Sequence, residues 1–200
     1  NRSREARAKA PPSFGALPLA VAFDGSASKD PDGNLLTYEW DFGDGSAKGS
    51  GAKPKHTYTT KKVFTVKLTV RDGRGGAATT TLPIYAGDTQ PQPTIANPTA
   101  DATFAVGQTI ALQGSATDAE DGTLPATALT WEVLLHHDTH THPYLVATAG
   151  NNLEFTAPPP EDLQAATNSY LEIRLTATDK EGLARTVARN LQPRKVDLTF

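Results

Sequence analysis

Tyr38-Glu39-Trp40-Asp41-Phe42-Gly43-Asp44-Gly45 is the stretch of this chain that decides its fold. The three aromatic residues alternate with acidic ones, so an extended strand places all three rings on one face. The Gly-Asp-Gly that follows predicts a tight turn, because such turns need a positive φ that glycine adopts without strain. An aromatic strand that runs into a turn of this kind predicts the central hairpin of a small β-sandwich.

Further elements lie on either side of this hairpin. Upstream, Lys29-Asp30-Pro31-Asp32-Gly33 predicts a second turn, which is rich in carboxylates. Downstream, His56-Thr57-Tyr58 returns the chain to the sheet. Residues 64–70 then alternate apolar and polar side chains in the longest regular strand pattern of the chain.

Together these segments resemble the PKD domain (polycystic kidney disease repeat). The signature of that family is an Asp-x-Asp-Gly turn, a Trp-Asp-Phe-Gly-Asp-Gly strand and a His-x-Tyr. Here these motifs stand at Asp30, Trp40 and His56. The resemblance extends to about residue 87 and implies an immunoglobulin-like β-sandwich.

Composition limits the class of protein. The 200 residues suffice for two small domains, and the chain has no cysteine to form a disulfide or a thiolate site. The net charge of −3 offers no basic face, so we expect no nucleic-acid partner. We expect no membrane span, because no apolar run approaches the ~18 residues that a span needs. Without a methionine or a secretory signal, the sequence is expected to be a piece of a longer chain.

The second half of the chain repeats the first. Gly25-Ser26-Ala27 recurs as Gly114-Ser115-Ala116, and Asp32-Gly33 recurs as Asp121-Gly122, both 89 residues further along. The sequence around Trp40 is echoed around Trp131 in the same order. The repeat predicts an all-β chain of two tandem immunoglobulin-like β-sandwiches. We expect a linker at 1–12, the PKD-type sandwich at 13–87, a linker at 88–93 and the second sandwich at 94–200, with about sixteen inserted residues.

Carboxylates in the turns form the first candidate site. Hard cations such as calcium take six to eight oxygen ligands, mostly from carboxylates and loop carbonyls. The PKD resemblance implies calcium at Asp30 and Asp32, and Asp72 and the weaker candidate Asp41 lie in similar turns. The alternative is that these side chains only cap backbone amides. The second half offers a parallel set: Asp118, Glu120, Asp121 and Asp179.

A histidine string forms the second candidate site: His136-His137-Asp138-Thr139-His140-Thr141-His142-Pro143-Tyr144. If Trp131 points inward, strand parity predicts an outward face that carries His136, Asp138, His140 and His142. Imidazoles in this pattern suit zinc or copper, provided that the strand bends. Two alternatives stand beside the metal site: a hydrogen-bonded loop or contact surface, and a sugar-binding face formed by Tyr144, His140 and His142.

The second half also resembles, less specifically, the C-terminal accessory region of secreted bacterial glucose/sorbosone dehydrogenase-like proteins. In those proteins a propeller that uses pyrroloquinoline quinone precedes a PKD domain and a module with a similar histidine string. The propeller is absent from this sequence, so neither its activity nor its cofactor is carried onto any residue here.

The sequence contains no convincing set of catalytic residues. It has no Gly-x-Ser-x-Gly motif, no glycine-rich loop between a strand and a helix, and paired carboxylates only in turns. We therefore expect a secreted, monomeric, non-catalytic module of a larger bacterial enzyme. Its expected partners are a polysaccharide or cell-surface glycan and the other domains of its parent. The alternatives are a transition-metal-dependent module and a purely structural spacer.

Overall fold

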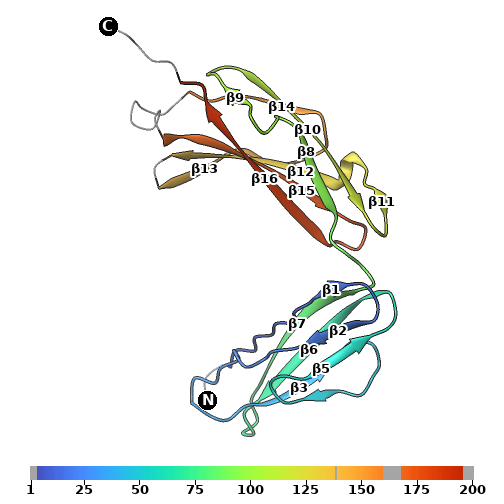
Figure 1. Ribbon diagram of the computed structural model, residues 1–200. Helices are drawn as coiled ribbons and strands as arrows, with labels where there is room; N and C mark the ends of the chain where they lie inside the picture. Colours follow the sequence, from blue (N-terminus) through green and yellow to red (C-terminus); the bar gives the residue numbers. More distant parts are fainter. Residues whose placement is uncertain (1–3, 138, 160–167, 196–200) are drawn as a thin grey trace. The chain divides into compact units, whose positions relative to one another are not determined.

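The computed structural model describes residues 4–137, 139–159 and 168–195. The chain divides into two compact units, Asn1–Thr89 and Gln90–Phe200 (Figure 1). Each unit is a pair of β-sheets around its own apolar core. The predicted fold class, all-β with two tandem β-sandwiches, is confirmed. No helix in the described part of the chain has the length and apolar character needed to cross a membrane.

The first unit contains a five-stranded and a two-stranded sheet. The order of the larger sheet is β1-β7-β6-β3-β4, and β2 pairs with β5 in the smaller one. The strands are β1 (Phe14–Gly15), β2 (Leu19–Ala22), β3 (Thr37–Asp41), β4 (Gly49–Ser50), β5 (Lys55–Tyr58), β6 (Lys62–Arg71) and β7 (Ala77–Ala86).

The decisive aromatic stretch forms β3 and the turn after it. Trp40 is fully buried and Phe42 is buried with it, while Tyr38 packs against the same core, so the predicted single aromatic face is confirmed. Gly43 has a φ of 78°, and a Cβ there would lie 2.5 Å from the carbonyl oxygen of Thr65. Only glycine therefore fits this turn.

The predicted linker at 1–12 is wrong for the residues described from Arg4 onward. The backbone of Glu5 pairs with that of Lys29, and the backbone of Lys9 pairs with that of Asp24. Ala10 is buried, and the alanines at 6 and 8 pack against the core. The segment alternates small apolar and charged residues, which is the pattern of an edge strand and not of a solvated linker.

The second unit is built in the same way. One sheet has the order β13-β12-β15-β16-β9; in the other, β10 pairs with β11, β14 and β8. A short 3₁₀ helix spans Ala126–Ala128. The strands are β8 (Gln92–Asn97), β9 (Thr103–Phe104), β10 (Thr109–Asp118), β11 (Gly122–Thr123), β12 (Leu129–His137), β13 (His140–Ala149), β14 (Leu153–Thr156), β15 (Tyr170–Thr178) and β16 (Ala184–Pro193). The division between the units, after Thr89, falls within the expected linker at 88–93, and β8 begins at Gln92.

The two units are equivalent at their centres. Trp40 pairs with Leu68 across β3 and β6, and Trp131, also fully buried, pairs with Leu175 across β12 and β15. A Cβ on Gly25 would lie 3.0 Å from Cζ2 of Trp40, and one on Gly114 would lie 3.0 Å from Cζ2 of Trp131. The repeated Gly-Ser-Ala motif therefore supplies the glycine that each buried indole needs.

The inserted residues of the second unit form part of the long hairpin of β12 and β13. The other features predicted for this half, a helical turn near residues 158–166 and a last strand at 196–200, fall wholly or largely outside the described residues.

Candidate functional site

An arginine lies among the carboxylates of the first unit. Asp72 is buried, and its Oδ1 accepts hydrogen bonds from the backbone N–H groups of Arg74 (2.8 Å) and Gly76 (2.9 Å). Its Oδ2 accepts a hydrogen bond from the guanidinium of Arg4, whose Nε lies 3.9 Å from Oδ2 of Asp30. These backbone bonds, followed by the charge of Arg4, lower the pKa of Asp72. The structure thus brings Asp30 and Asp72 to a shared arginine.

The other acids of the first unit act in turns. The N–H of Asp32 donates to Oδ1 of Asp30 at 2.8 Å, and the side chain of Asp32 is exposed. Oδ1 of Asp41 accepts a hydrogen bond from the N–H of Gly43 at 3.0 Å. Both contacts match the alternative in which the carboxylates cap backbone amides.

In the second unit two buried carboxylates each have one oxygen without a hydrogen bond. Asp118 is 5% exposed, and its Oδ1 accepts from the N–H groups of Glu120 and Asp121, both at 2.9 Å. Asp179 is 7% exposed, and its Oδ1 accepts from the N–H of Leu183 at 2.8 Å. Within the described residues, neither Oδ2 atom has a hydrogen-bond partner.

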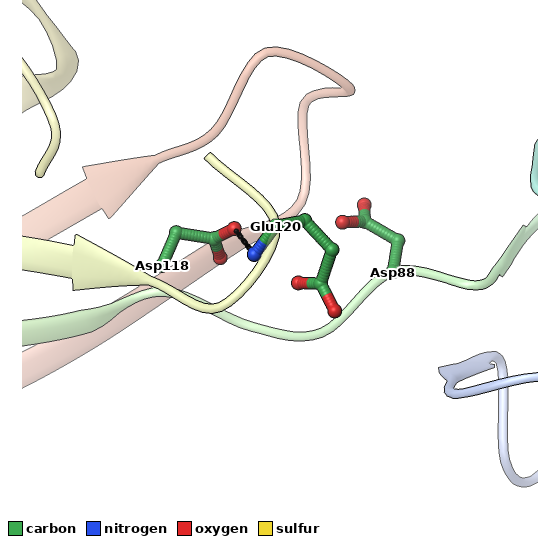
Figure 2. A group of neighbouring side chains, drawn as sticks. All are labelled: Asp88, Asp118 and Glu120. Atoms are coloured by element: carbon green, nitrogen blue, oxygen red, sulfur yellow. Dashed lines mark hydrogen bonds between the residues drawn. The ribbon is translucent and has the colours of Figure 1, made fainter. Parts of the chain in front are cut away.

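Further acidic side chains gather around this pair. Figure 2 shows Asp118 and Glu120, which offer oxygens within 4.8 Å of each other. Asp179 and Glu181 form a second pair within the same distance. Burial, followed by the neighbouring charges of Asp118 and Glu181, raises the pKa of Asp179. The result is a concentration of negative charge around buried carboxylates.

Sequence reasoning identified this cluster only in part. Asp121, one of the predicted ligands, accepts hydrogen bonds from Lys180, with Nζ at 2.7 Å and the backbone N–H at 3.2 Å. Glu181 was not predicted. Glu181 follows Asp179 by two residues, as Glu120 follows Asp118, and that repeated Asp-x-Glu spacing is the signal that could have found it.

The histidine string reverses direction where a continuous strand was predicted. β12 ends at His137 and β13 begins at His140, which pairs with His137 across the hairpin. The ring of His137 stacks on that of His142, with centroids 5.0 Å apart, and lies 5.8 Å from that of His140. His136 lies apart from this stack: its ring stacks on Tyr170 and its Nε2 is 2.7 Å from Oε2 of Glu172.

The predicted metal face of His136, Asp138, His140 and His142 is therefore not assembled as expected. His137, which parity placed inward, joins His140 and His142, while Asp138 lies outside the described residues. Across residues 4–137, 139–159 and 168–195, no group of three ligand atoms within 4.8 Å of one another includes a histidine nitrogen.

Tyr144 is the most exposed of the described tyrosines and belongs to the same strand, β13. The residue is 41% exposed, and its ring meets that of Phe155 edge-on, with centroids 5.9 Å apart. Its hydroxyl donates to the carbonyl oxygen of Thr156 at 2.6 Å, so both ends of the side chain are held. His140, His142 and Val146 of β13 are also exposed. The three predicted sugar-binding residues thus lie on one strand.

In the first unit, the histidine of the PKD signature has a structural partner. Nε2 of His56 lies 2.6 Å from Oδ2 of Asp44, and its ring stacks on Phe42 with centroids 4.1 Å apart. Burial raises the pKa of Asp44, but hydrogen bonds from Ser46 and His56 outweigh it and lower the pKa to about 2. The histidine therefore ties β5 to the turn after β3.

Comparison with known proteins agrees with the motifs of the first unit. Residues 7–85 match the family model of the PKD domain. The chain is 45% identical over 71 residues to collagenase ColA of Clostridium perfringens, which covers 36% of the chain and 6% of that protein. It is 35% identical over 85 residues to the microbial collagenase of Vibrio alginolyticus, which covers 40% of the chain and 10% of that protein.

Solved structures align with both units. A structure of carbohydrate-binding modules from the β-sandwich superfamily aligns with a TM-score of 0.41 and 20% identity, over 96% of this chain and 99% of that one. The chain spans only 6% and 10% of the length of the two collagenases. The match to the family model confirms, for residues 7–85, the PKD resemblance predicted from Asp30, Trp40 and His56.

Proposed function

We propose that this chain is a non-catalytic accessory region of a larger secreted bacterial enzyme. The observation that carries this proposal is the match of residues 7–85 to a PKD domain that forms a small fraction of long bacterial proteins. In such an arrangement other parts of the parent protein carry out the chemistry. These β-sandwiches then bind a ligand or act as a spacer between domains. The relatives named above are collagenases, so a sugar-oxidising parent rests on the resemblance of the second half alone.

The ligand that we propose is a polysaccharide, bound on β13 of the second unit. An aromatic ring offers an apolar face to a sugar ring and a polar edge to water. Tyr144 is held by its hydrogen bond to Thr156 and its contact with Phe155, so little side-chain freedom is lost on binding. The exposed imidazoles of His140 and His142 add hydrogen-bonding groups on the same strand.

Pull-down of the full chain with insoluble cellulose, chitin and xylan, beside collagen fibres, tests this proposal. We expect one polysaccharide to retain the protein and the Tyr144→Ala variant to bind it about tenfold more weakly. Leu35→Ala is the matched control, because it removes an exposed apolar side chain from the first unit. Retention by collagen alone would overturn the ligand class, and equal binding of the Tyr144 variant would overturn the site. Retention by none of these supports would favour a spacer.

One observation favours a second candidate, a transition-metal module. The imidazoles of His140 and His142 both stack on that of His137 at the end of the β12–β13 hairpin. Imidazole nitrogens are common ligands for zinc and copper. Parallel stacked rings direct their nitrogens alongside one another, so this module would need its side chains to turn toward a shared ion.

A further inference from the structure

Each unit contains an acidic turn of the same kind. In the first unit the carboxylate of this turn is paired with a cationic side chain. In the first unit the N–H of Asp72 donates to the carbonyl oxygen of Gly76, and Oδ1 of Asp72 accepts from the N–H of Gly76. In the second unit Asp179 makes the same two bonds with Leu183, also four residues later. Asp72 and Asp179 close the echoed sequences Leu-Thr-Val-Arg-Asp and Leu-Thr-Ala-Thr-Asp, so they are structural equivalents.

The difference between the units lies at the second oxygen of each carboxylate. Oδ2 of Asp72 receives the guanidinium of Arg4, a side chain that is itself 7% exposed. Oδ2 of Asp179 has no hydrogen-bond partner among the described residues, and neither has Oδ2 of the nearby Asp118. Burying an ionised carboxylate without a counter-charge is strongly unfavourable.

The neighbouring groups add to this imbalance. Asp118 and Glu181 both act on Asp179 as like charges. The side chain of Lys180 is 75% exposed and its ammonium bonds to Asp121, so it does not take the place of Arg4. The second unit thus holds the buried acidic turn of the first, and among its described residues no cationic side chain bonds to Asp179 as Arg4 bonds to Asp72.

We propose that a calcium ion takes the place of this missing cation in the second unit. It is held by the Oδ2 atoms of Asp118 and Asp179, with Glu120 and Glu181 as further ligands. The oxygens of Asp118 and Glu120 lie within 4.8 Å of each other, and so do those of Asp179 and Glu181. Two oxygens on opposite sides of one calcium ion are about 5 Å apart, so either pair can contact the ion, and Asp118 lies close enough to Asp179 for its charge to act on that carboxyl.

The donors and their support favour calcium over other cations. All four side chains offer oxygen only, which suits hard cations and not zinc or copper. They come from two loops, β10–β11 and β15–β16, and calcium tolerates the irregular geometry of such a site better than magnesium does. Backbone N–H groups hold the Oδ1 atoms of both aspartates, as the dashed line to Glu120 in Figure 2 shows for Asp118, and this fixes the direction of each Oδ2.

Calcium titration of the full chain by calorimetry, after treatment with a chelator, tests the proposal. We expect one site, a higher melting temperature in excess calcium, and weaker binding of magnesium. The Asp179→Asn and Glu120→Gln/Glu181→Gln variants should bind calcium at least about tenfold more weakly. Glu120 and Glu181 are exposed, so the double variant keeps the test valid if Asp179→Asn does not fold.

Two controls locate the ion. Asp101→Asn removes an exposed acid from the same unit, and Asp32→Asn removes the exposed acid of the PKD turn. Both should bind calcium as the wild type does. A wild-type chain with neither calorimetric binding nor a shift in melting temperature would overturn the proposal. So would folded Asp179 and Glu120/Glu181 variants with wild-type affinity, or loss of binding in Asp32→Asn alone.

Discussion

At the scale of single residues, the linker interpretation missed the contribution of Arg4 to the stability of the first unit. Its guanidinium lies beside Asp72 and Asp30, whose side chains are almost fully buried. Removing one partner of a buried ion pair is strongly destabilising, because it leaves the other charge buried without a counter-charge. Arg4 therefore acts as a core residue although it lies close to the start of the chain.

We predict that Arg4→Met destabilises the first unit. Methionine keeps much of the volume but leaves Asp72 without its counter-charge, so the melting temperature should fall by about 5 °C or more. Differential scanning calorimetry measures the shift. Arg7→Met is the matched control, because Arg7 pairs with Glu5 on the exposed surface and its loss should change little. Equal effects of the two substitutions would contradict a special role for Arg4.

Asp44 predicts how the stability of the first unit depends on pH. Its pKa falls from an ordinary 3.8 to about 2 in the folded chain, where Ser46 and His56 bond to its ionised form. A lowered pKa stabilises the fold above the ordinary value, and that stabilisation is lost as the pH falls from about 4 to about 2.

The Asp44→Asn variant measures this contribution. It should be less stable than the wild type at pH 6, and the difference should shrink between about pH 4 and pH 2. Urea denaturation at several pH values, followed by the fluorescence of Trp40 in a Trp131→Phe background, reports on the first unit alone. A difference that stays constant over this range would show that the carboxylate charge of Asp44 does not matter.

At the scale of elements, the β12–β13 hairpin is where sequence reasoning failed most clearly. Strand parity correctly predicted the buried side of β12 at Trp131 and Val133, but it was extended through residues at which the chain turns back. The sequence His-Asp-Thr-His contains neither glycine nor proline, so the strongest local turn signals do not mark the reversal. Cross-strand partners such as His137 and His140 become visible only once the register is known.

We predict that this hairpin binds zinc weakly, because imidazole nitrogens are ligands for zinc but the stacked side chains must turn to share one ion. His137→Ala/His142→Ala should abolish the binding. His136→Ala should not, because His136 is engaged with Glu172 and Tyr170. Titration of the full chain by calorimetry measures all three. Binding that is lost only in the His136 variant would show that the stack is not the site.

The strands themselves were easier to predict than the sites. The alternation at residues 64–70 became the central part of β6, and the aromatic alternation became β3. Those patterns are local, and burial fixes them. The acidic side chains of the second unit come from two loops that are distant in the sequence. Whether each carboxylate can bind a cation depends on partners that the periodicity of the sequence cannot reveal.

At the scale of the whole molecule, the repeat carries more information than either half alone. The pairing of Trp40 with Leu68 and of Trp131 with Leu175 identifies equivalent positions in the two units. Comparison of these positions shows that the acidic turn is paired with an arginine in the first unit. The repeat was visible in the sequence. The contrast at the acidic turn was not, because the arginine lies in a segment that resembled a linker.

That segment has a consequence for proteolysis and for the choice of fragment ends. Residues 4–10 pair with the chain near Lys29 and Asp24 and bury Ala10, yet Pro11 and Pro12, just beyond them, are exposed. A fragment that starts at Ser13 would lose this pairing together with Arg4, and we expect its first unit to lose its cooperative melting transition. A fragment that starts at Arg4 should keep it, and calorimetry of the two distinguishes them. A single proteolytic cut near the two prolines, followed by release of the short peptide, would then unfold the first unit as effectively as a substitution in its core.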